Sequence, residues 1–547
     1  MKMTRRGAFG LVALGAATPV LAQTQGSPSS AAPTAGPLSG DAARSFGDWT
    51  EMTWPRGIEG QRRGDLGDGT FLNPVLAGDH PDPSILKDGD TYYMTHSSFE
   101  SVPGLTIWQS KDLVNWTPIV AALTRNIGSV WAPELCKHDG RFFLYIPARF
   151  PDSRTNWVIW ADKIEGPWSE PVDLHLPDHI DPGHVVGEDG KRYLFLSGGD
   201  MVQLTDDGMA TVGAVRHVYD PWHYPVEWDV EGFSPEGPKV MKRGEWFYMI
   251  TAVGGTAGPP TGHMVIVARS KSVFGPWEDH PRNPIVRTAT SREKWWSRGH
   301  ATFVEGPAGD WWTVYHGYEN AFWTLGRQTL LDKIVWAADG WPDVVGGDLS
   351  HPMAKPANLP DQQHGMALSD DFSTDKFGTQ WSFYNPGADE KRRFRLEGGV
   401  LHMAAKGTAP KDCSPLTFVQ GEHAYQFEVE IEIDEGTTAG LVLFYDYALY
   451  AGLGFDEKRF VTHQYGMERG KPGHTMGRRM HMRVTNDNHI VTFHTSPDGQ
   501  TWTKFDRQME VSGYHQNVRG GFMMLRPGLY SAGAGEARFR DFQYRAL

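Results

Sequence analysis

Four acidic residues and one histidine occupy similar positions along the first 300 residues of the chain. Each lies six to nine residues before a glycine in a polar turn, and they are Asp82, Glu134, Asp181, Glu236 and His300. Carboxyl groups that share a confined site raise one another's pKa, so one can stay protonated while another stays ionised. Residues of these types, if they meet, are suited to general acid–base chemistry.

A repeated strand pattern predicts that these residues do meet. A glycine turn followed by an aromatic-rich strand occurs five times, with spacings of 51, 50, 54 and 65 residues between Gly89, Gly140, Gly190, Gly244 and Gly309. Hairpin turns that need a positive φ favour glycine. Five units of about 50 residues predict an all-β fold, a five-bladed β-propeller, whose inner strands would bring polar residues to one axis. The alternative is a large β-sandwich with accidental internal similarity.

Composition limits the classes of protein to which the chain can belong. Its 547 residues exceed the roughly 250–300 that one hydrophobic core serves, so at least two domains are expected. The net charge of −14 argues against a nucleic-acid partner. The mean hydropathy of −0.45 means that most of the chain cannot span a membrane. The two cysteines, Cys136 and Cys413, are too few for a disulfide scaffold, and we expect buried free thiols.

The first residues are typical of an export signal. Residues 1–22 combine a basic start with an apolar stretch and small residues at a cleavage position. The pair Arg5 and Arg6 resembles a twin-arginine signal, and an ordinary secretory signal is the alternative. We therefore expect a periplasmic or secreted protein. Residues 23–69 are predicted to form a flexible leader.

The pattern changes after the predicted propeller, which we assign to residues 70–351. Residues 352–366 contain three prolines and little periodicity, which predicts a linker. From Tyr425 to Ile433, apolar residues then alternate with polar ones, as in a half-buried strand. Residues 367–547 are therefore predicted to form a β-sandwich.

Six short motifs resemble those of glycoside hydrolase family 43, in the family's order and at blade spacing across residues 70–350. They are HPDPS with Asp82, WAPEL with Trp131, IDP with Asp181, EGP with Glu236, GHA with His300 and LGRQTLL with Arg327. The resemblance implies a five-bladed propeller that hydrolyses glycosidic bonds with inversion of configuration.

The resemblance also implies catalytic roles. Asp82 would be the general base that activates water, Glu236 the general acid, and Asp181 the group that orients Glu236 and raises its pKa. Inversion needs two carboxyl groups roughly 6.5–9.5 Å apart, which residues on different blades allow. Glu231 is a rival for the acid but lacks the following proline, and Glu134 is expected to be structural.

Further residues are implied to bind the sugar. Arg327 would hydrogen-bond hydroxyl groups, Trp131 and Phe99 would form the walls of the site, and His263 would face it. His300 resembles a family histidine near the propeller axis that is often linked to a calcium ion through water. A lone histidine is more often a buried, hydrogen-bonded group, and calcium prefers oxygen ligands. No cofactor is expected to be required, and calcium is a candidate.

The predicted sandwich resembles the concanavalin-like C-terminal domain of many β-xylosidases of that family. This pairing implies an exo-acting enzyme that releases xylose, arabinose or both from plant oligosaccharides. The alternatives are a sugar-binding propeller without catalysis, or a glycosidase of the same fold that acts on galactan or fructan. The chain departs from the family pattern at Asp79, which replaces a bulkier residue directly before HPDPS. Such departures leave the preferred sugar open.

Overall fold

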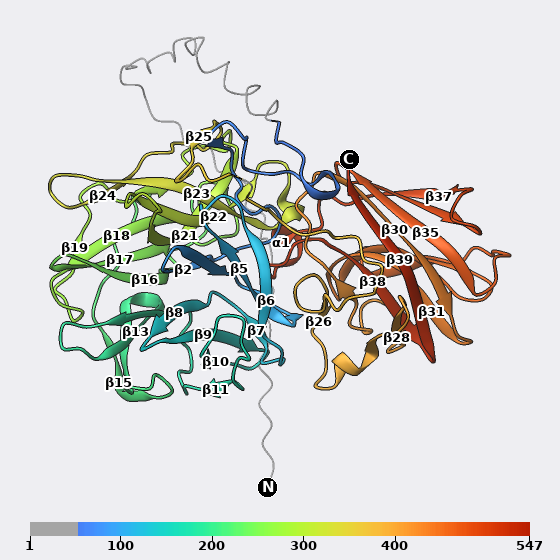
Figure 1. Ribbon diagram of the computed structural model, residues 1–547, viewed down its shortest axis with the longest axis horizontal. Helices are drawn as coiled ribbons and strands as arrows, with labels where there is room; N and C mark the ends of the chain where they lie inside the picture. The colour runs from blue at the N-terminus through green and yellow to red at the C-terminus, as the bar shows by residue number, and fades with distance from the viewer. Residues whose placement is uncertain (1–52, 361) are drawn as a thin grey trace, which may run out of the picture. The chain divides into compact units, whose positions relative to one another are not determined.

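The computed structural model describes residues 53–360 and 362–547, so the predicted export signal and most of the predicted leader lie outside the described residues. Five antiparallel sheets follow one another along the first part of the chain (Figure 1). Their first long strands contact one another in sequence, and that of the last blade contacts that of the first, which closes a ring. The predicted five-bladed β-propeller is confirmed.

Each blade is an antiparallel sheet of four or five strands. Blade 1 contains β2 (Ser84–Asp88), β3 (Thr91–Thr95), β5 (Gly104–Ser110) and β6 (Thr117–Leu123), and blade 2 contains β7 (Ser129–Val130), β8 (Glu134–His138), β9 (Arg141–Phe150), β10 (Ser153–Ala161) and β11 (Val172–Asp173). Blade 3 contains β12 (Gly183–Val186), β13 (Arg192–Leu196), β14 (Asp200–Leu204) and β15 (Thr211–His217), and blade 4 contains β16 (Glu236–Arg243), β17 (Trp246–Val253), β18 (Met264–Ser270), β19 (Glu278–Asp279) and β20 (Val286–Arg287). Blade 5 contains β21 (Trp295–Glu305), β22 (Trp311–Glu319), β23 (Arg327–Trp336) and β24 (Pro342–Val344).

The predicted turn glycines connect the first two long strands of every blade. Their φ angles lie between 63° and 80°, a region that residues with a Cβ rarely adopt, at Gly89, Gly140, Gly190, Gly244 and Gly309. The ring contacts involve β2, β8, β12, β16 and β21, the strands that begin at or just after the predicted polar residues or contain one of them. The repeat in the sequence therefore corresponds to the blade in the structure.

Two segments predicted to be irregular are packed against the propeller instead. Strand β1 (Thr70–Phe71) pairs with β25 (Met353–Ala354), which lies inside the predicted linker. Ahead of β1, Arg62 is buried and its guanidinium lies 2.9 Å from the carboxylate of Glu319. The prediction of a flexible leader reaching residue 69 was wrong there, and the predicted linker includes a short strand that pairs with the propeller segment. Both segments are poor in apolar residues, and buried polar contacts hold them.

Two sheets form the C-terminal β-sandwich, and Figure 1 shows its long strands β30, β35 and β39 lying side by side. The eight-stranded sheet contains β34 (Met467–Gly470), β33 (Phe460–Gln464), β32 (Leu449–Phe455), β31 (Thr437–Asp446), β38 (Arg526–Gly533), β29 (Leu416–Thr417), β26 (Ser382–Tyr384) and β4 (Ser101–Val102). The seven-stranded sheet contains β27 (Phe394–Leu396), β28 (Leu401–Ala404), β39 (Glu536–Ala546), β30 (Ala424–Ile433), β35 (Arg479–Asp487), β36 (Ile490–Ser496) and β37 (Thr503–Glu510).

The alternation predicted for β30 is confirmed, because every second side chain from Tyr425 to Ile433 is buried in the sandwich core. Cys136 and Cys413 are buried free thiols in separate cores. The described helices are one-turn elements: η1 (Ile58–Gly60), η2 (Ser197–Gly199), η3 (Trp323–Leu325), η4 (Glu390–Arg393) and α1 (Gln516–Arg519). In the part of the chain that the structure describes, no helix has the length and apolar character needed to cross a membrane.

The propeller contributes an edge strand to the sandwich. Strand β4 belongs to the connection between β3 and β5 of the first blade, yet it pairs with β26 of the eight-stranded sheet. A second backbone hydrogen bond joins the two domains: the amide of Leu525 in the sandwich donates to the carbonyl oxygen of Thr324 in the propeller over 2.9 Å. The two domains therefore share a hydrogen-bonded boundary.

Candidate active site

One small cavity collects residues from all five blades and from the sandwich. Its walls contain three carboxyl groups, one guanidinium, one imidazole and three aromatic rings. The lining residues are Asp82, Phe99, Trp131, Ala132, Ile180, Asp181, Glu236, Thr256, His300, Arg327 and Phe522. The structure thus brings together every predicted site residue except His263.

The backbone at four of these residues is in the left-handed region, with φ of 48° at Phe99, 55° at Asp82, 57° at Asp181 and 59° at His300. This conformation is unfavourable by about 1 kcal/mol or more for a residue with a Cβ. Asp82 and Asp181 lie two residues before the first residues of β2 and β12, the inner strands of blades 1 and 3, and His300 lies within β21 of blade 5. Strain of this kind is concentrated at functional sites, where the surrounding fold maintains it.

Asp82 is held as a carboxylate by positive and hydrogen-bonding partners. Arg327, the first residue of β23, places its two terminal nitrogens 2.9 and 3.3 Å from the two oxygens of Asp82. The hydroxyl of Ser97 donates to Oδ2, and the Asp82 amide donates to Nδ1 of His316. Burial acts to raise the pKa of Asp82, but the charge of Arg327 and the nearby histidines hold it well below its usual value.

Glu236 and Asp181 show the opposite behaviour. Glu236 begins β16, and burial together with the charges of Asp181 and Asp82 raises its pKa well above the usual value. Burial and the charge of Asp82 likewise raise the pKa of Asp181 to about 7. An oxygen of Asp181 accepts the amide hydrogen of Gly237 over 3.1 Å, which fixes it beside the backbone that carries Glu236.

Three aromatic rings form one wall of the cavity. The ring of Phe99 stacks on that of Phe522, with centroids 5.9 Å apart and planes inclined by 24°. Trp131 meets the same Phe522 edge-on at 5.8 Å. Phe522 comes from the sandwich, and no motif in the sequence singled it out. The sandwich therefore contributes directly to this cavity.

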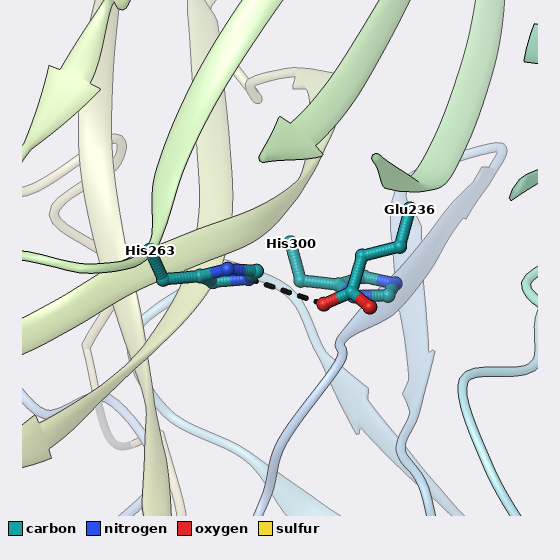
Figure 2. A group of neighbouring side chains, drawn as sticks. All are labelled: Glu236, His263 and His300. Carbon is teal, nitrogen blue, oxygen red and sulfur yellow. Dashed lines mark ion pairs between the residues drawn. The ribbon is translucent and has the colours of Figure 1, made fainter. Parts of the chain in front are cut away.

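His263 occupies a different place from the one expected. It is fully buried, does not line the cavity, and stacks on His316 with ring centroids 5.2 Å apart. Its Nε2 lies 3.8 Å from Oε1 of Glu236, and the dashed line in Figure 2 marks this pair. The expectation that His263 faces the sugar is therefore corrected: this residue contacts the carboxyl group of Glu236 instead.

Potential ligand atoms of Glu236, His263 and His300 lie within 4.8 Å of one another, so these residues form a group that could hold a metal (Figure 2). One carboxylate with two imidazoles does not fit calcium, which takes six to eight oxygen ligands. The ammonium group of Lys239 lies among three oxygens that a calcium ion could otherwise use. It is 2.7 Å from the carboxylate of Glu134, and it also donates to the carbonyl oxygens of Pro133 and Pro182. Direct calcium coordination by this group is not supported, and calcium held through water at His300 stays a prediction.

Comparisons with known proteins match both domains. Residues 71–342 match the model of glycosyl hydrolases family 43, and residues 369–545 match the beta-xylosidase C-terminal concanavalin A-like domain. A xylan 1,3-beta-xylosidase from a Vibrio species is 34% identical over 335 residues, which is 53% of this chain and 60% of that protein.

Other relatives are similar over more of their length. A non-reducing end alpha-L-arabinofuranosidase of Bacteroides ovatus, BoGH43B, is 32% identical over 68% of this chain and 73% of its own. The crystal structure of the GH43 protein BlXynB from Bacillus licheniformis aligns with a TM-score of 0.78 at 27% identity, covering 87% of this chain and all of that chain. With its propeller, its sandwich and its motifs thus matched, the chain belongs to family 43 of the glycosyl hydrolases.

Proposed function

We propose that the protein is an inverting exo-glycosidase that releases terminal pentoses, xylose or arabinose, from plant cell-wall oligosaccharides. The observation that carries the proposal is the opposite pKa shift of two carboxyl groups on one cavity. The pKa of Asp82 is held low and that of Glu236 is raised, as a base and an acid require at the same pH.

On the base side, ionised Asp82 accepts a proton from a water molecule as that water attacks the anomeric carbon. Arg327 engages both carboxylate oxygens and so fixes the orientation of the base. This contact uses the terminal nitrogens that were expected to bind sugar hydroxyls. Arg327 therefore acts mainly by holding Asp82, with any contact to the sugar in addition.

On the acid side, protonated Glu236 donates its proton to the glycosidic oxygen as the bond to the leaving group breaks. Asp181 supports this step in two ways. Its negative charge helps to keep the proton on Glu236. It also accepts a hydrogen bond from the Gly237 amide, which orients the first two residues of β16. The attack of water opposite the leaving group inverts the configuration of the anomeric carbon.

The aromatic wall supports cleavage from a chain end. Trp131, Phe99 and Phe522 present ring surfaces on which the C–H faces of a terminal sugar can pack, and Phe522 narrows the cavity from the sandwich side. The relatives carry xylosidase and arabinofuranosidase names, which supports a pentose as the sugar released. Which pentose is preferred depends on loop contacts to one or two hydroxyl groups of the sugar.

A product profile on xylobiose, arabinobiose and intact arabinoxylan tests this proposal. We expect only monosaccharide from the disaccharides, and monosaccharide without intermediate oligomers from the polymer. A ladder of oligomers would contradict the exo mode. Absence of turnover on glycosides of xylose, arabinose, galactose and fructose would favour a sugar-binding propeller instead.

We further propose that turnover needs no added cofactor, because the acid and the base are both side chains of the protein. Activity should persist after treatment with EDTA. A loss that calcium alone restores would support calcium near His300 and contradict cofactor independence.

We also propose export to the periplasm or the medium, from the signal-like residues 1–22. N-terminal sequencing should give a mature chain that begins near Gln23. Replacing Arg5 and Arg6 by lysine should trap the precursor if the twin-arginine route is used. Normal export of that variant would indicate the general secretory route.

A further inference from the structure

A buried ion pair joins the two domains close to the cavity. Arg526, the first residue of β38 in the sandwich, places Nη2 3.2 Å from Oδ2 of Asp79 in the propeller. Both residues are at most 5% exposed. Asp79 lies three residues before Asp82, at the position where the sequence departs from the family pattern. A buried carboxylate is unfavourable without a partner, and the sandwich supplies one.

The second oxygen of Asp79 reaches the backbone of Arg327. The Arg327 amide donates to Oδ1 over 3.4 Å, and the next amide along the loop, that of His80, donates to the Arg327 carbonyl oxygen over 2.9 Å. The preceding residue, Gly326, has φ of 71°, and a Cβ there would clash with the Asp79 carboxylate. The loop that leads to Asp82 is therefore fixed to the start of β23.

Arg526 has a further anchor on the propeller side. Its Nη1 donates to the hydroxyl of Ser101, which lies in β4, the propeller strand that completes the eight-stranded sheet of the sandwich. The guanidinium thus joins the edge strand, the loop before Asp82 and, through Asp79, the backbone of Arg327. These are the segments that set the position of the base.

We propose that Asp79 and Arg526 are positioning residues through which the docked sandwich orients the Arg327–Asp82 pair. The proposal rests on the function proposed above, in which Asp82 is the base. The chain of contacts runs from Arg526 to Asp79, from Asp79 to the Arg327 backbone, and from the Arg327 guanidinium to Asp82. The sandwich thereby influences the water-activating side of the site as well as its wall.

The test is the double variant Asp79→Asn, Arg526→Met, which removes both charges and leaves an oxygen for the Arg327 amide. The control is Asn126→Ala, which removes a different contact between the domains, 2.8 Å from Asn126 Nδ2 to the Pro386 carbonyl oxygen. We expect kcat of the double variant to fall by about 10- to 100-fold, since small misplacements of a catalytic group have effects of this size. We expect KM to change little, and the control to keep its kcat.

Two further readouts separate positioning from mere docking. The acid limb of kcat/KM should move to higher pH, because an Arg327 that is held less firmly lowers the pKa of Asp82 less. The fractional loss should be equal on a nitrophenyl glycoside and on a disaccharide, because water activation is needed with either leaving group. A lower melting temperature with kcat and the acid limb unchanged would overturn the proposal.

A milder variant and a reference variant complete the design. If the double variant does not fold, Arg526→Lys keeps the charge but loses the second donor, and it should shift the acid limb in the same direction by less. An unshifted limb in that variant would also overturn the proposal. Asp82→Asn is measured in parallel: if it stays active, the proposed function fails, whereas an inactive Asp82→Asn beside an unaffected double variant refutes only the positioning role.

Discussion

Asp82 and Glu236 lie on two sides of the cavity, and different neighbouring groups surround their carboxyl groups. Burial alone would raise the pKa of both Asp82 and Glu236. Asp82 has two nitrogens of Arg327 and the Ser97 hydroxyl within hydrogen-bonding distance. Glu236 has negative neighbours and a histidine 3.8 Å away whose own pKa is far below its usual value, so the histidine is uncharged. Neighbouring charge, and not depth, therefore decides which group is base and which is acid.

The largest loss of activity is expected from removing the base, Asp82. Asp82→Asn should lower kcat by about 10²–10⁴-fold, the usual contribution of a general base. The loss should be similar for a nitrophenyl glycoside and for xylobiose, because both need an activated water. Steady-state kinetics on the two substrates check this, and circular dichroism checks that the fold is kept. More than a tenth of the wild-type activity on xylobiose would remove Asp82 from this role.

Removing the acid should depend on the leaving group. Glu236→Gln should lower kcat on xylobiose by about 10²–10⁴-fold but should affect a nitrophenyl glycoside much less, because nitrophenolate leaves without a proton. The ratio of the two losses is the quantity to measure. Equal losses on both substrates would show that Glu236 is not the proton donor.

A smaller effect is expected from Asp181→Asn, which should shift mainly the alkaline limb of the pH–activity profile. The raised pKa of Glu236 keeps its proton available below that pKa, and activity is lost as the pH rises through it. Asp181→Asn removes a negative charge that helps to raise this pKa. The alkaline limb of the profile should therefore move to lower pH, while the acid limb, set by Asp82, should stay closer to its wild-type position. An unmoved alkaline limb would separate Asp181 from the acid.

The smallest effect is expected from the sandwich wall. Phe522→Ala removes a ring that packs on Phe99 and Trp131. The guanidinium of Arg327 also lies 5.3 Å from the centroid of this ring, but the variant keeps the hydrogen bonds between Arg327 and Asp82. Contacts of this kind contribute about 0.5–1.5 kcal/mol, so KM should rise about two- to thirteenfold. Both limbs of the pH profile should stay in place. A shifted limb would mean that Phe522 also affects the acid or the base.

The sequence predicted what is encoded locally or by repetition. The five turn glycines marked the blades, and alternation marked β30. Asp82, Asp181 and Glu236 were identified as site residues because their motifs lie at blade spacing in the order of the family they resemble, and the cavity collects all three. Their chemical roles stay predictions.

Contacts between distant parts of the chain could not be predicted. His316 bonds the Asp82 amide, and Phe522 lies on Phe99, yet the residues of each pair are more than 200 positions apart and share no motif. His263 was expected to face the cavity, whereas its side chain is fully buried. Arg62 shows the same limit, since its buried partner Glu319 is far away in sequence.

The most direct test of the central claim is the configuration of the sugar when it is first released. Proton NMR during hydrolysis of a β-linked xyloside by the wild-type protein resolves the two anomers before they equilibrate. If Asp82 activates water while Glu236 protonates the leaving group, α-xylose should appear first, and the β anomer should follow only by mutarotation. Initial release of β-xylose would show retention of configuration. It would mean that Asp82 acts as a nucleophile and not as a base, which would contradict the account.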